Sequence, residues 1–163
     1  MVEISSRCST PAFRRHATLV GTLLDSGREV LVKTDTLAKK ISPFSITLGE
    51  IDYSEEYFKA LFIDVQRTPE LMNANAVARE VFQEKRLDDE YKPHMSLLYA
   101  NMPAHEKEVL IREVFREVGG RKAFSGAQFV VDRLDLYSTD GKVDNWYFVD
   151  SCYLEKAQNR LQA

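Results

Sequence analysis

Apolar residues recur with two different periods along the chain, and each change of period predicts a change between strand and helix. In residues 13–24 the side chains alternate, so that His16 and Thr18 share one face while Ala17 and Leu19 share the other. The predicted strands span residues 13–24, 44–53, 57–66, 94–100, 128–137 and 145–153, and the predicted helices span 28–41, 69–85 and 103–118, with a short helix after residue 154.

Local signals mark the ends of two of these helices. Thr68-Pro69-Glu70 combines a hydroxyl cap, a proline in the first turn and an acid that suits the helix dipole, so a helix should begin there. Gly119-Gly120 should end the helix over residues 103–118. Strand pairs then lie between and after the helices, and this order predicts an α+β fold of two similar lobes within a single domain, residues 1–163.

Composition and charge exclude some classes of protein. The apolar fraction of 44% and the charged fraction of 29% are typical of a globular domain. The net charge of −3 argues against a protein that binds long nucleic acid mainly by charge, although a basic pocket for a small nucleotide remains compatible with it. No segment reaches the length of a membrane span and no secretory leader is visible, so a cytoplasmic protein without a membrane partner is expected. Cys8 and Cys152 have no metal-binding spacing; two reduced thiols are favoured, and one long-range disulfide stays open.

One short motif occurs twice. His16-Ala17-Thr18-Leu19 and His94-Met95-Ser96-Leu97 both read histidine, any residue, hydroxyl, leucine. In a strand, the histidine and the hydroxyl at i+2 point to the same side, roughly 6.6 Å apart along the chain. Two copies that face each other could therefore hold one small anion between two imidazoles.

The chemistry of this pair suits a phosphate ester. Imidazole has an unperturbed pKa near 6.5, so one ring can act as base on water while the other, protonated, acts as acid on the leaving oxygen. The hydroxyls of Thr18 and Ser96 can donate hydrogen bonds to phosphate oxygens. No metal or other cofactor is indicated, because neither motif has a second histidine or acid at ligand spacing.

The two motifs resemble the signatures of the two-histidine (2H) phosphoesterase superfamily. The matching stretches are Phe13-Arg14-Arg15-His16-Ala17-Thr18-Leu19 and Pro93-His94-Met95-Ser96-Leu97-Leu98-Tyr99-Ala100, supported by Phe62-Ile63-Asp64-Val65-Gln66-Arg67-Thr68-Pro69-Glu70-Leu71-Met72. Within the superfamily, the chain is most similar to the cyclic nucleotide phosphodiesterases of plants and fungi that act after tRNA splicing.

This resemblance implies a bilobal fold in which two antiparallel sheets line a central groove and helices lie outside. It implies hydrolysis of nucleoside 2′,3′-cyclic phosphates to 2′-phosphates, and of ADP-ribose 1″,2″-cyclic phosphate to the 1″-phosphate, without a metal. By motif position, His16 and His94 are the acid–base pair, Thr18 and Ser96 hold the phosphate, and Tyr99 lines the groove. Strand parity argues instead for Tyr99 in the core, and the residues do not decide which histidine is the base.

Two departures from the family pattern concern the first motif. Relatives have a strand and a helix before it, which here are missing or reorganised, and they carry proline where this chain has Arg15. A missing strand would leave a sheet edge exposed, so a monomer is expected with dimerisation through this edge as the alternative.

Two other functions stay open on the sequence. One is processing of RNA ends, either by 2′–5′ RNA ligase-like chemistry or by trimming of a 3′ tail. The other is a non-catalytic module that binds a nucleotide. The acidic net charge disfavours a long RNA track and any stable nucleic-acid partner, whereas Arg15 and the short start motivate the binding module.

Overall fold

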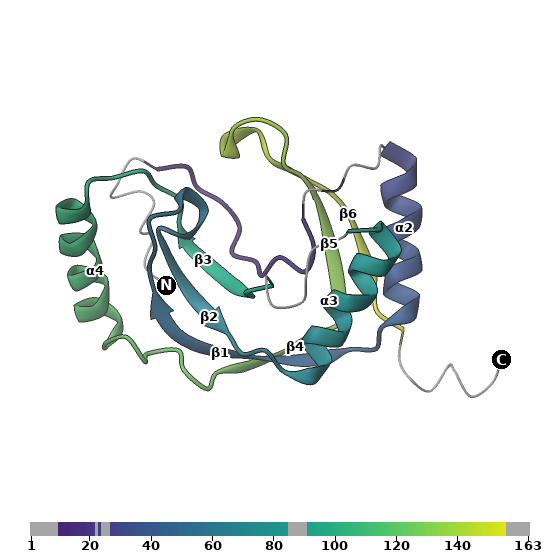
Figure 1. The fold of residues 1–163 in the computed structure, drawn as a ribbon, viewed down its shortest axis with the longest axis horizontal. Helices are drawn as coiled ribbons and strands as arrows, with labels where there is room; N and C mark the ends of the chain where they lie inside the picture. The colour runs from purple at the N-terminus through teal and green to yellow at the C-terminus, as the bar shows by residue number, and fades with distance from the viewer. Residues whose placement is uncertain (1–9, 22, 24–26, 85–90, 156–163) are drawn as a thin grey trace. The chain divides into compact units, whose positions relative to one another are not determined.

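The computed structural model describes residues 10–21, 23, 27–84 and 91–155 (Figure 1). These residues form two compact units, and the chain alternates between them. Unit 1 contains the described residues of segments 1–18, 47–66 and 93–127, and unit 2 contains those of segments 19–46, 67–92 and 128–163. In the described part, no helix is long and apolar enough to cross a membrane.

Unit 1 is built on strands that lie within residues 47–66 and on the strand that carries the second motif. Its elements are most of β1 (Phe44–Asp52), the 3₁₀ turn η1 (Tyr57–Lys59), β2 (Leu61–Val65), β3 (His94–Leu98) and α4 (Ala104–Val118). Strand β2 lies between β1 and β3 and is antiparallel to both. Leu61, Ile63 and Val65 are buried on one face of β2, whereas Phe62 and Asp64 lie on the other, more open face.

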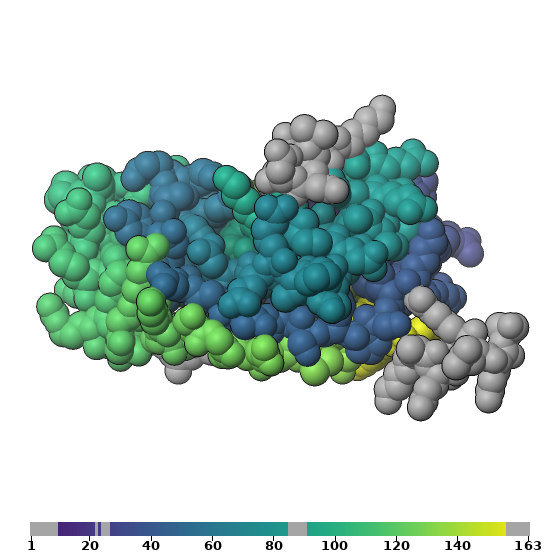
Figure 2. Space-filling view, turned by 60° about the horizontal axis from the view of Figure 1, so that its bottom comes forward, coloured from purple at the N-terminus to yellow at the C-terminus, as the bar shows by residue number. Residues whose placement is uncertain are grey.

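Helix α4 contributes a buried stripe to unit 1. Leu110, Ile111 and Val114 are buried, in keeping with the helical spacing of the sequence. The helix ends at Gly119, which adopts a φ of 93° and closes the last turn through a bond from its N–H to the Phe115 carbonyl. Figure 2 shows α4 and the following segment, residues 119–127, at the surface.

Unit 2 pairs two helices with a hairpin. Its elements are α2 (Gly27–Lys40), the start of β1, α3 (Pro69–Phe82), β4 (Gln128–Val131), β5 (Arg133–Ser138), the 3₁₀ turn η3 (Val143–Asn145) and β6 (Tyr147–Tyr153). Helix α2 contacts α3 and both strands of the antiparallel β5–β6 hairpin. Strand β4 pairs with β1 and completes a sheet of order β3-β2-β1-β4, so β1 serves both units.

The predicted α+β class, with antiparallel sheets and helices, is confirmed. The three long helices are confirmed within a few residues at each end. Thr68 caps α3 as expected, since its hydroxyl oxygen accepts a bond from the Leu71 N–H at 3.3 Å. The short helix expected after residue 154 falls mainly on residues outside the described part.

Three predicted strands are corrected. Residues 13–24 do not form a regular strand in their described part, where a single bridge involves Ala17. The Arg14 carbonyl accepts a bond from His16 Nδ1 and the Leu19 carbonyl one from Asn75 Nδ2, so side chains occupy acceptors that a ladder would use. The strand over 57–66 begins only at Leu61, because the preceding residues close a 3₁₀ turn. The strand over 128–137 is broken at Asp132 into β4 and β5, which join different sheets.

Candidate functional site

The first motif, as far as Thr18, and the second motif lie side by side within unit 1. Ala17 forms an antiparallel bridge with Met95, the middle residue of the second motif. An ideal antiparallel ladder through this bridge would set His16 opposite Ser96 and Thr18 opposite His94, with all four side chains on the face away from Ala17 and Met95. Directly opposite residues have Cβ atoms about 4.5–5.5 Å apart and diagonal ones about 7–8 Å. In that ideal ladder the two histidines would be diagonal neighbours, at a spacing that one phosphate group can fill.

His16 is exposed and has a defined proton arrangement. Its Nδ1 lies 2.6 Å from the Arg14 carbonyl oxygen, and since a carbonyl can only accept, Nδ1 must carry the proton and donate it. Nε2 is then the nitrogen available for proton transfer with a ligand. The ring also meets the edge of Phe13, with centroids 6.3 Å apart.

His94 is half-buried at the start of β3. Its ring makes an edge contact with Phe62 of β2, with centroids 5.6 Å apart and an interplanar angle of 72°. Phe62 therefore fixes one side of the imidazole, while the first motif lies across the other edge of the strand.

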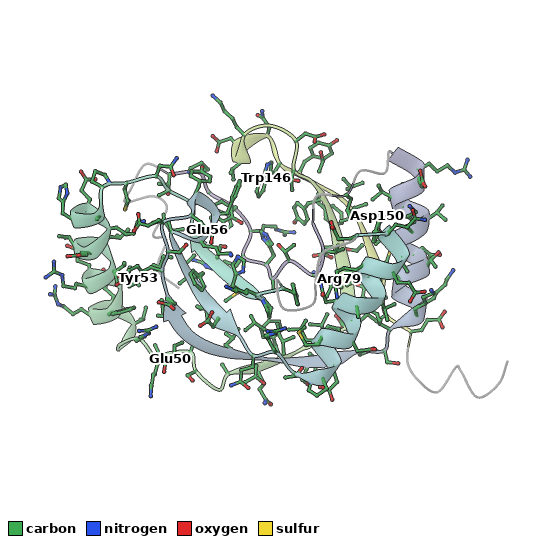
Figure 3. All side chains as sticks on the ribbon, in the orientation of Figure 1. Glu50, Tyr53, Glu56, Arg79, Trp146 and Asp150 are labelled. Carbon is green, nitrogen blue, oxygen red and sulfur yellow. The ribbon has the colours of Figure 1, made fainter. Side chains whose placement is uncertain are left out.

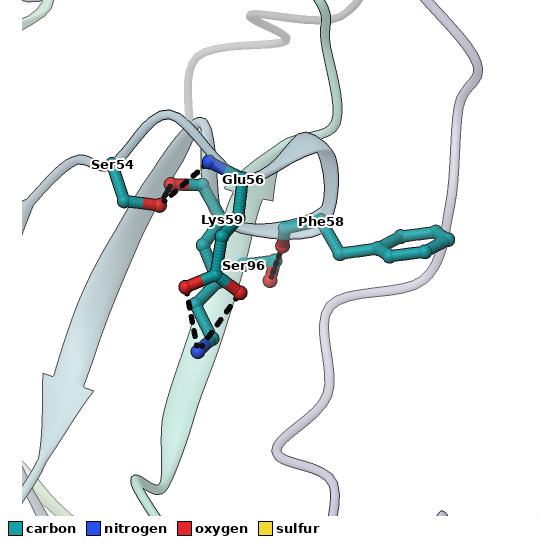
Figure 4. A network of polar contacts seen from close by, with 5 residues as sticks. All are labelled: Ser54, Glu56, Phe58, Lys59 and Ser96. Carbon is teal, nitrogen blue, oxygen red and sulfur yellow. Dashed lines mark hydrogen bonds and ion pairs between the residues drawn. The ribbon is translucent and has the colours of Figure 1, made fainter. Parts of the chain in front are cut away.

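Ser96 is buried, in contrast to Thr18. Only 4% of Ser96 is exposed, and its hydroxyl donates to the Phe58 carbonyl at 2.8 Å (Figure 4). Thr18 is exposed. Ser96 must therefore rotate its hydroxyl away from Phe58 to donate to a phosphate, and its role as a phosphate ligand stays a prediction.

Tyr99 belongs to a cluster of aromatic rings beside the motifs. It is 4% exposed and stacks on Phe13, with centroids 3.8 Å apart and planes within 8°. Phe58 and Tyr57 contact it as well, at centroid distances of 5.2 and 6.1 Å. Burial raises the pKa of Tyr99, a hydrogen bond with Ser96 opposes this, and Tyr57 adds to it, so Tyr99 stays a neutral phenol at physiological pH. The cluster links both motifs, while contact between Tyr99 and a substrate stays a prediction.

The loop that carries Phe58 is held by a buried lysine that the sequence reading did not single out. Lys107 of α4 is 3% exposed, and its Nζ donates to the Ser54 carbonyl at 2.9 Å and to Glu55 at 3.2 Å. Ser54 and Lys59 close the same loop, which Figure 4 shows next to Ser96. The sequence contains a pattern that indicates this burial. Lys107 stands three residues before Leu110 and four before Ile111, on the apolar stripe of the helix.

A row of carboxylates on β1 and β2 was also not predicted from the sequence. Asp64 of β2 is the direct cross-strand partner of His94, and Asp52 of β1 is that of Phe62. Glu50, labelled in Figure 3, and Asp52 both pair with Arg121 at 3.1 Å. The pattern that could have indicated this row is the occurrence of acidic residues at alternate positions of the predicted strands. Among the described residues, no group of three or more histidines, cysteines or acids is arranged to hold a metal ion.

Of the two cysteines, Cys8 lies outside the described residues. Cys152 is a free, half-buried thiol in β6, and burial raises its pKa, with Asp150 and Asp35 adding to the effect and Lys39 opposing it. The raised pKa keeps this thiol protonated and unreactive. The third histidine, His105, has a side chain that is 80% exposed at the start of α4 and lies apart from the motifs in sequence and element.

Known proteins resemble this chain along most of its length. Residues 10–143 match the family model described as the 2′-5′ RNA ligase superfamily. The chain is 24% identical, over 157 residues, to a cyclic phosphodiesterase of Arabidopsis thaliana, covering 94% of this chain and 84% of the relative. It is 25% identical, over 137 residues, to a 2′,3′-cyclic-nucleotide 3′-phosphodiesterase of Yarrowia lipolytica, covering 63% of each chain. The matched region contains both histidine motifs and the whole of unit 1 that the structure describes, and the chain belongs to the 2′-5′ RNA ligase superfamily, the two-histidine phosphoesterases.

Proposed function

We propose that the protein is a cyclic phosphodiesterase that opens small nucleotide-derived cyclic phosphates. The observation that carries this proposal is the bridge between Ala17 and Met95, because it sets both imidazole–hydroxyl pairs on one face of a single unit. The names of the Arabidopsis and Yarrowia relatives support cyclic phosphodiesterase activity in general.

The reaction needs two proton transfers around one phosphorus atom. One imidazole removes a proton from water as the water oxygen forms a bond to phosphorus. The other, protonated imidazole gives its proton to the ribose oxygen whose bond to phosphorus breaks. The Nε2 of His16 can serve either role, because Nδ1 is engaged with the Arg14 carbonyl. Thr18 and Ser96 donate to the remaining phosphate oxygens, whose charge strengthens these bonds.

The finer substrate assignment is part of the proposal. We expect nucleoside 2′,3′-cyclic phosphates to be opened to 2′-phosphates, and ADP-ribose 1″,2″-cyclic phosphate to the 1″-phosphate. Arg14 and Arg15, both exposed next to His16, provide positive charge for such anions despite a net charge of −3.

The test is a hydrolysis assay with 2′,3′-cyclic nucleotides in the presence of EDTA. We expect turnover by the wild type, and a loss of about 10²–10⁴ in kcat/KM for His16→Ala and for His94→Ala, the usual range for removing a proton-transfer group. His105→Ala is the matched control, because it removes the remaining histidine from an exposed site and should leave kcat/KM unchanged. An inactive wild type, or full activity in either motif variant, contradicts the proposal; micromolar nucleotide binding without product would instead favour a binding module.

A second candidate is chemistry at RNA ends, which the description of the matched family favours. The same assay should then be repeated with oligonucleotides that end in a 2′,3′-cyclic phosphate or contain a 2′–5′ linkage. A kcat/KM for these oligonucleotides well above that for mononucleotides would place RNA-end processing first.

A further inference from the structure

Asp64 occupies a defined position relative to His94. In the register of β2 and β3, Asp64 is the direct partner of His94 and Phe62 is that of Ser96. Side chains of paired residues point to the same face, so Asp64, Phe62, His94 and Ser96 share the face that carries the candidate site. The edge contact between Phe62 and His94 agrees with this placement.

The packing between β1 and β2 restricts the position of the Asp64 Cβ. A side-chain carbon added at Gly49 of β1 would lie 3.0 Å from the Cβ of Asp64 and 3.3 Å from its carbonyl oxygen. Gly49 thus gives Asp64 the room that it occupies, and little space remains for it to move toward β1. The side chain of Asp64 therefore starts on the face of the sheet that it shares with His94.

The charged groups that face His94 are mostly acidic. Asp64 is the nearest on β2, and Glu50 and Asp52 lie one strand further on β1. The cations on that side are engaged with the β1 acids, since Arg121 pairs with both of them and Lys122 lies 3.6 Å from Glu50. On the other side of β3, the first motif presents His16 and the neutral Thr18, and the exposed Arg14 and Arg15 next to His16 are cations on that side.

The electrostatics of Asp64 agree with this arrangement. Burial of its carboxyl raises the pKa of Asp64, and Asp52 and Glu50 raise it further, while Arg121 and His94 lower it. The coupling between two titrating groups is reciprocal, so the ionised Asp64 must favour a protonated His94 in the same measure. His16, by contrast, has a neutral carbonyl as its partner.

We propose that Asp64 is a positioning residue for His94, whose carboxylate orients the imidazole and stabilises its protonated form. The inference deepens the proposed function, on which its catalytic meaning rests. It makes the pair of histidines unequal, with His94 the more basic ring. In the ring-opening reaction His94 then begins protonated and gives its proton to the leaving ribose oxygen, while His16 begins neutral and takes the proton from water.

The test is an NMR pH titration of the histidine ring protons in the full chain. The three histidines allow assignment by single His→Gln variants. We expect the titration midpoint of His94 to lie above that of His16 in the wild type. In Asp64→Asn the His94 midpoint should move to lower pH, while those of His16 and His105 stay in place. Asp64→Glu, which keeps the charge, should restore much of the shift.

Asp52→Asn is the matched control, because it removes a carboxylate from the same face one strand further away. It should move the His94 midpoint less than Asp64→Asn does. An unchanged His94 midpoint in Asp64→Asn, a shift of equal size in Asp52→Asn, or a wild-type His16 midpoint above that of His94 would overturn the proposal.

Asp64→Asn should fold well enough for this measurement. The pKa of Asp64 is higher in the folded state than its ordinary value of 3.8. The folded wild type therefore loses stability as the pH rises from 3.8 to the raised pKa, and it loses no more above that pKa. The asparagine variant does not titrate there, so at neutral pH it should be at least as stable as the wild type in urea unfolding.

Kinetics separate this inference from the proposed function. In active protein, the limb of the kcat/KM profile that reports loss of the acid's proton should move to lower pH in Asp64→Asn. If no cyclic phosphate is hydrolysed but the His94 midpoint shifts, the proposed function fails and the coupling stands. If hydrolysis occurs without a shift of the midpoint or of the limb, the function stands and the role of Asp64 fails.

Discussion

At the scale of single residues, the two motifs carry the same functional group, a hydroxyl, but one of these hydroxyl residues is buried and the other is exposed. Ser96 supports the fold by donating to the Phe58 carbonyl at 2.8 Å, whereas Thr18 is exposed. We expect Ser96→Ala to lower the free energy of unfolding by about 1–3 kcal/mol, since it removes the donor that Ser96 supplies to a carbonyl inside the protein. Thr18→Ala should change it by no more than about 0.5 kcal/mol.

Activity should not follow stability in these two variants. A hydrogen bond to a charged phosphate contributes about 1.5–3 kcal/mol, so loss of either hydroxyl should lower kcat/KM by roughly 10- to 100-fold. Urea unfolding and the cyclic-nucleotide assay on both variants provide the measurements. A Thr18→Ala variant with wild-type kcat/KM would show that its hydroxyl does not bind the phosphate.

Single residues also show which parts of the candidate site could be predicted from the sequence. The shared face of His16 and Thr18, and of His94 and Ser96, follows from strand geometry within each motif. Asp64 could not be assigned in the same way, because its place beside His94 depends on the register between β2 and β3, which is set by residues thirty positions apart. The burial of Ser96 likewise depends on a loop, residues 53–60, that reaches it from another part of the chain.

At the scale of elements, helices were easier to predict than strands, for a physical reason. The limits of α3 and α4 are set by nearby residues such as Thr68 and Gly119, whose bonds lie within one turn. A strand needs a partner that the local sequence does not contain. Residues 13–24 have the alternation of a strand, but they form one bridge in their described part, because His16 and Asn75 side chains bond to the carbonyls.

Strand β1 contains a glycine, Gly49, that has little free space around its Cα. The ladder between β1 and β2 shifts register between Leu48 and Ile51, and Gly49 lies within this irregular stretch. A methyl group there would stand 3.0 Å from the Asp64 Cβ, closer than ordinary packing allows. We expect Gly49→Ala to lower the free energy of unfolding by about 1–3 kcal/mol through overpacking, as urea unfolding can measure.

Ser45→Ala is the control for this change, because Ser45 is an exposed residue of the same strand and should shift the unfolding free energy by no more than about 0.5 kcal/mol. The NMR signal of His94 adds a second readout, since a displaced Asp64 alters the surroundings of that ring. A Gly49→Ala variant as stable as the wild type, with an unmoved His94 signal, would mean that the two strands adjust without strain.

At the scale of the whole molecule, the chain connects the two units too often for either to be cut out. Six segments alternate between the units, and β1 contributes residues to both. The histidine and the hydroxyl residue of each motif belong to unit 1, although they come from segments that are separated by most of unit 2 along the chain. Local patterns predict segments of this kind but not their grouping, because the grouping depends on contacts between distant residues.

This connectivity predicts a single cooperative unfolding transition. Trp146, labelled in Figure 3, is the one tryptophan of the chain and reports on unit 2, while the ring signal of His94 reports on unit 1. In a urea titration the two probes should give the same midpoint. Thr68→Ala, which removes the α3 cap in unit 2, should cost about 0.5–2 kcal/mol and lower both midpoints equally. A lower midpoint for Trp146 with an unchanged one for His94 would show that the units unfold separately, and that the shared strand β1 does not couple them.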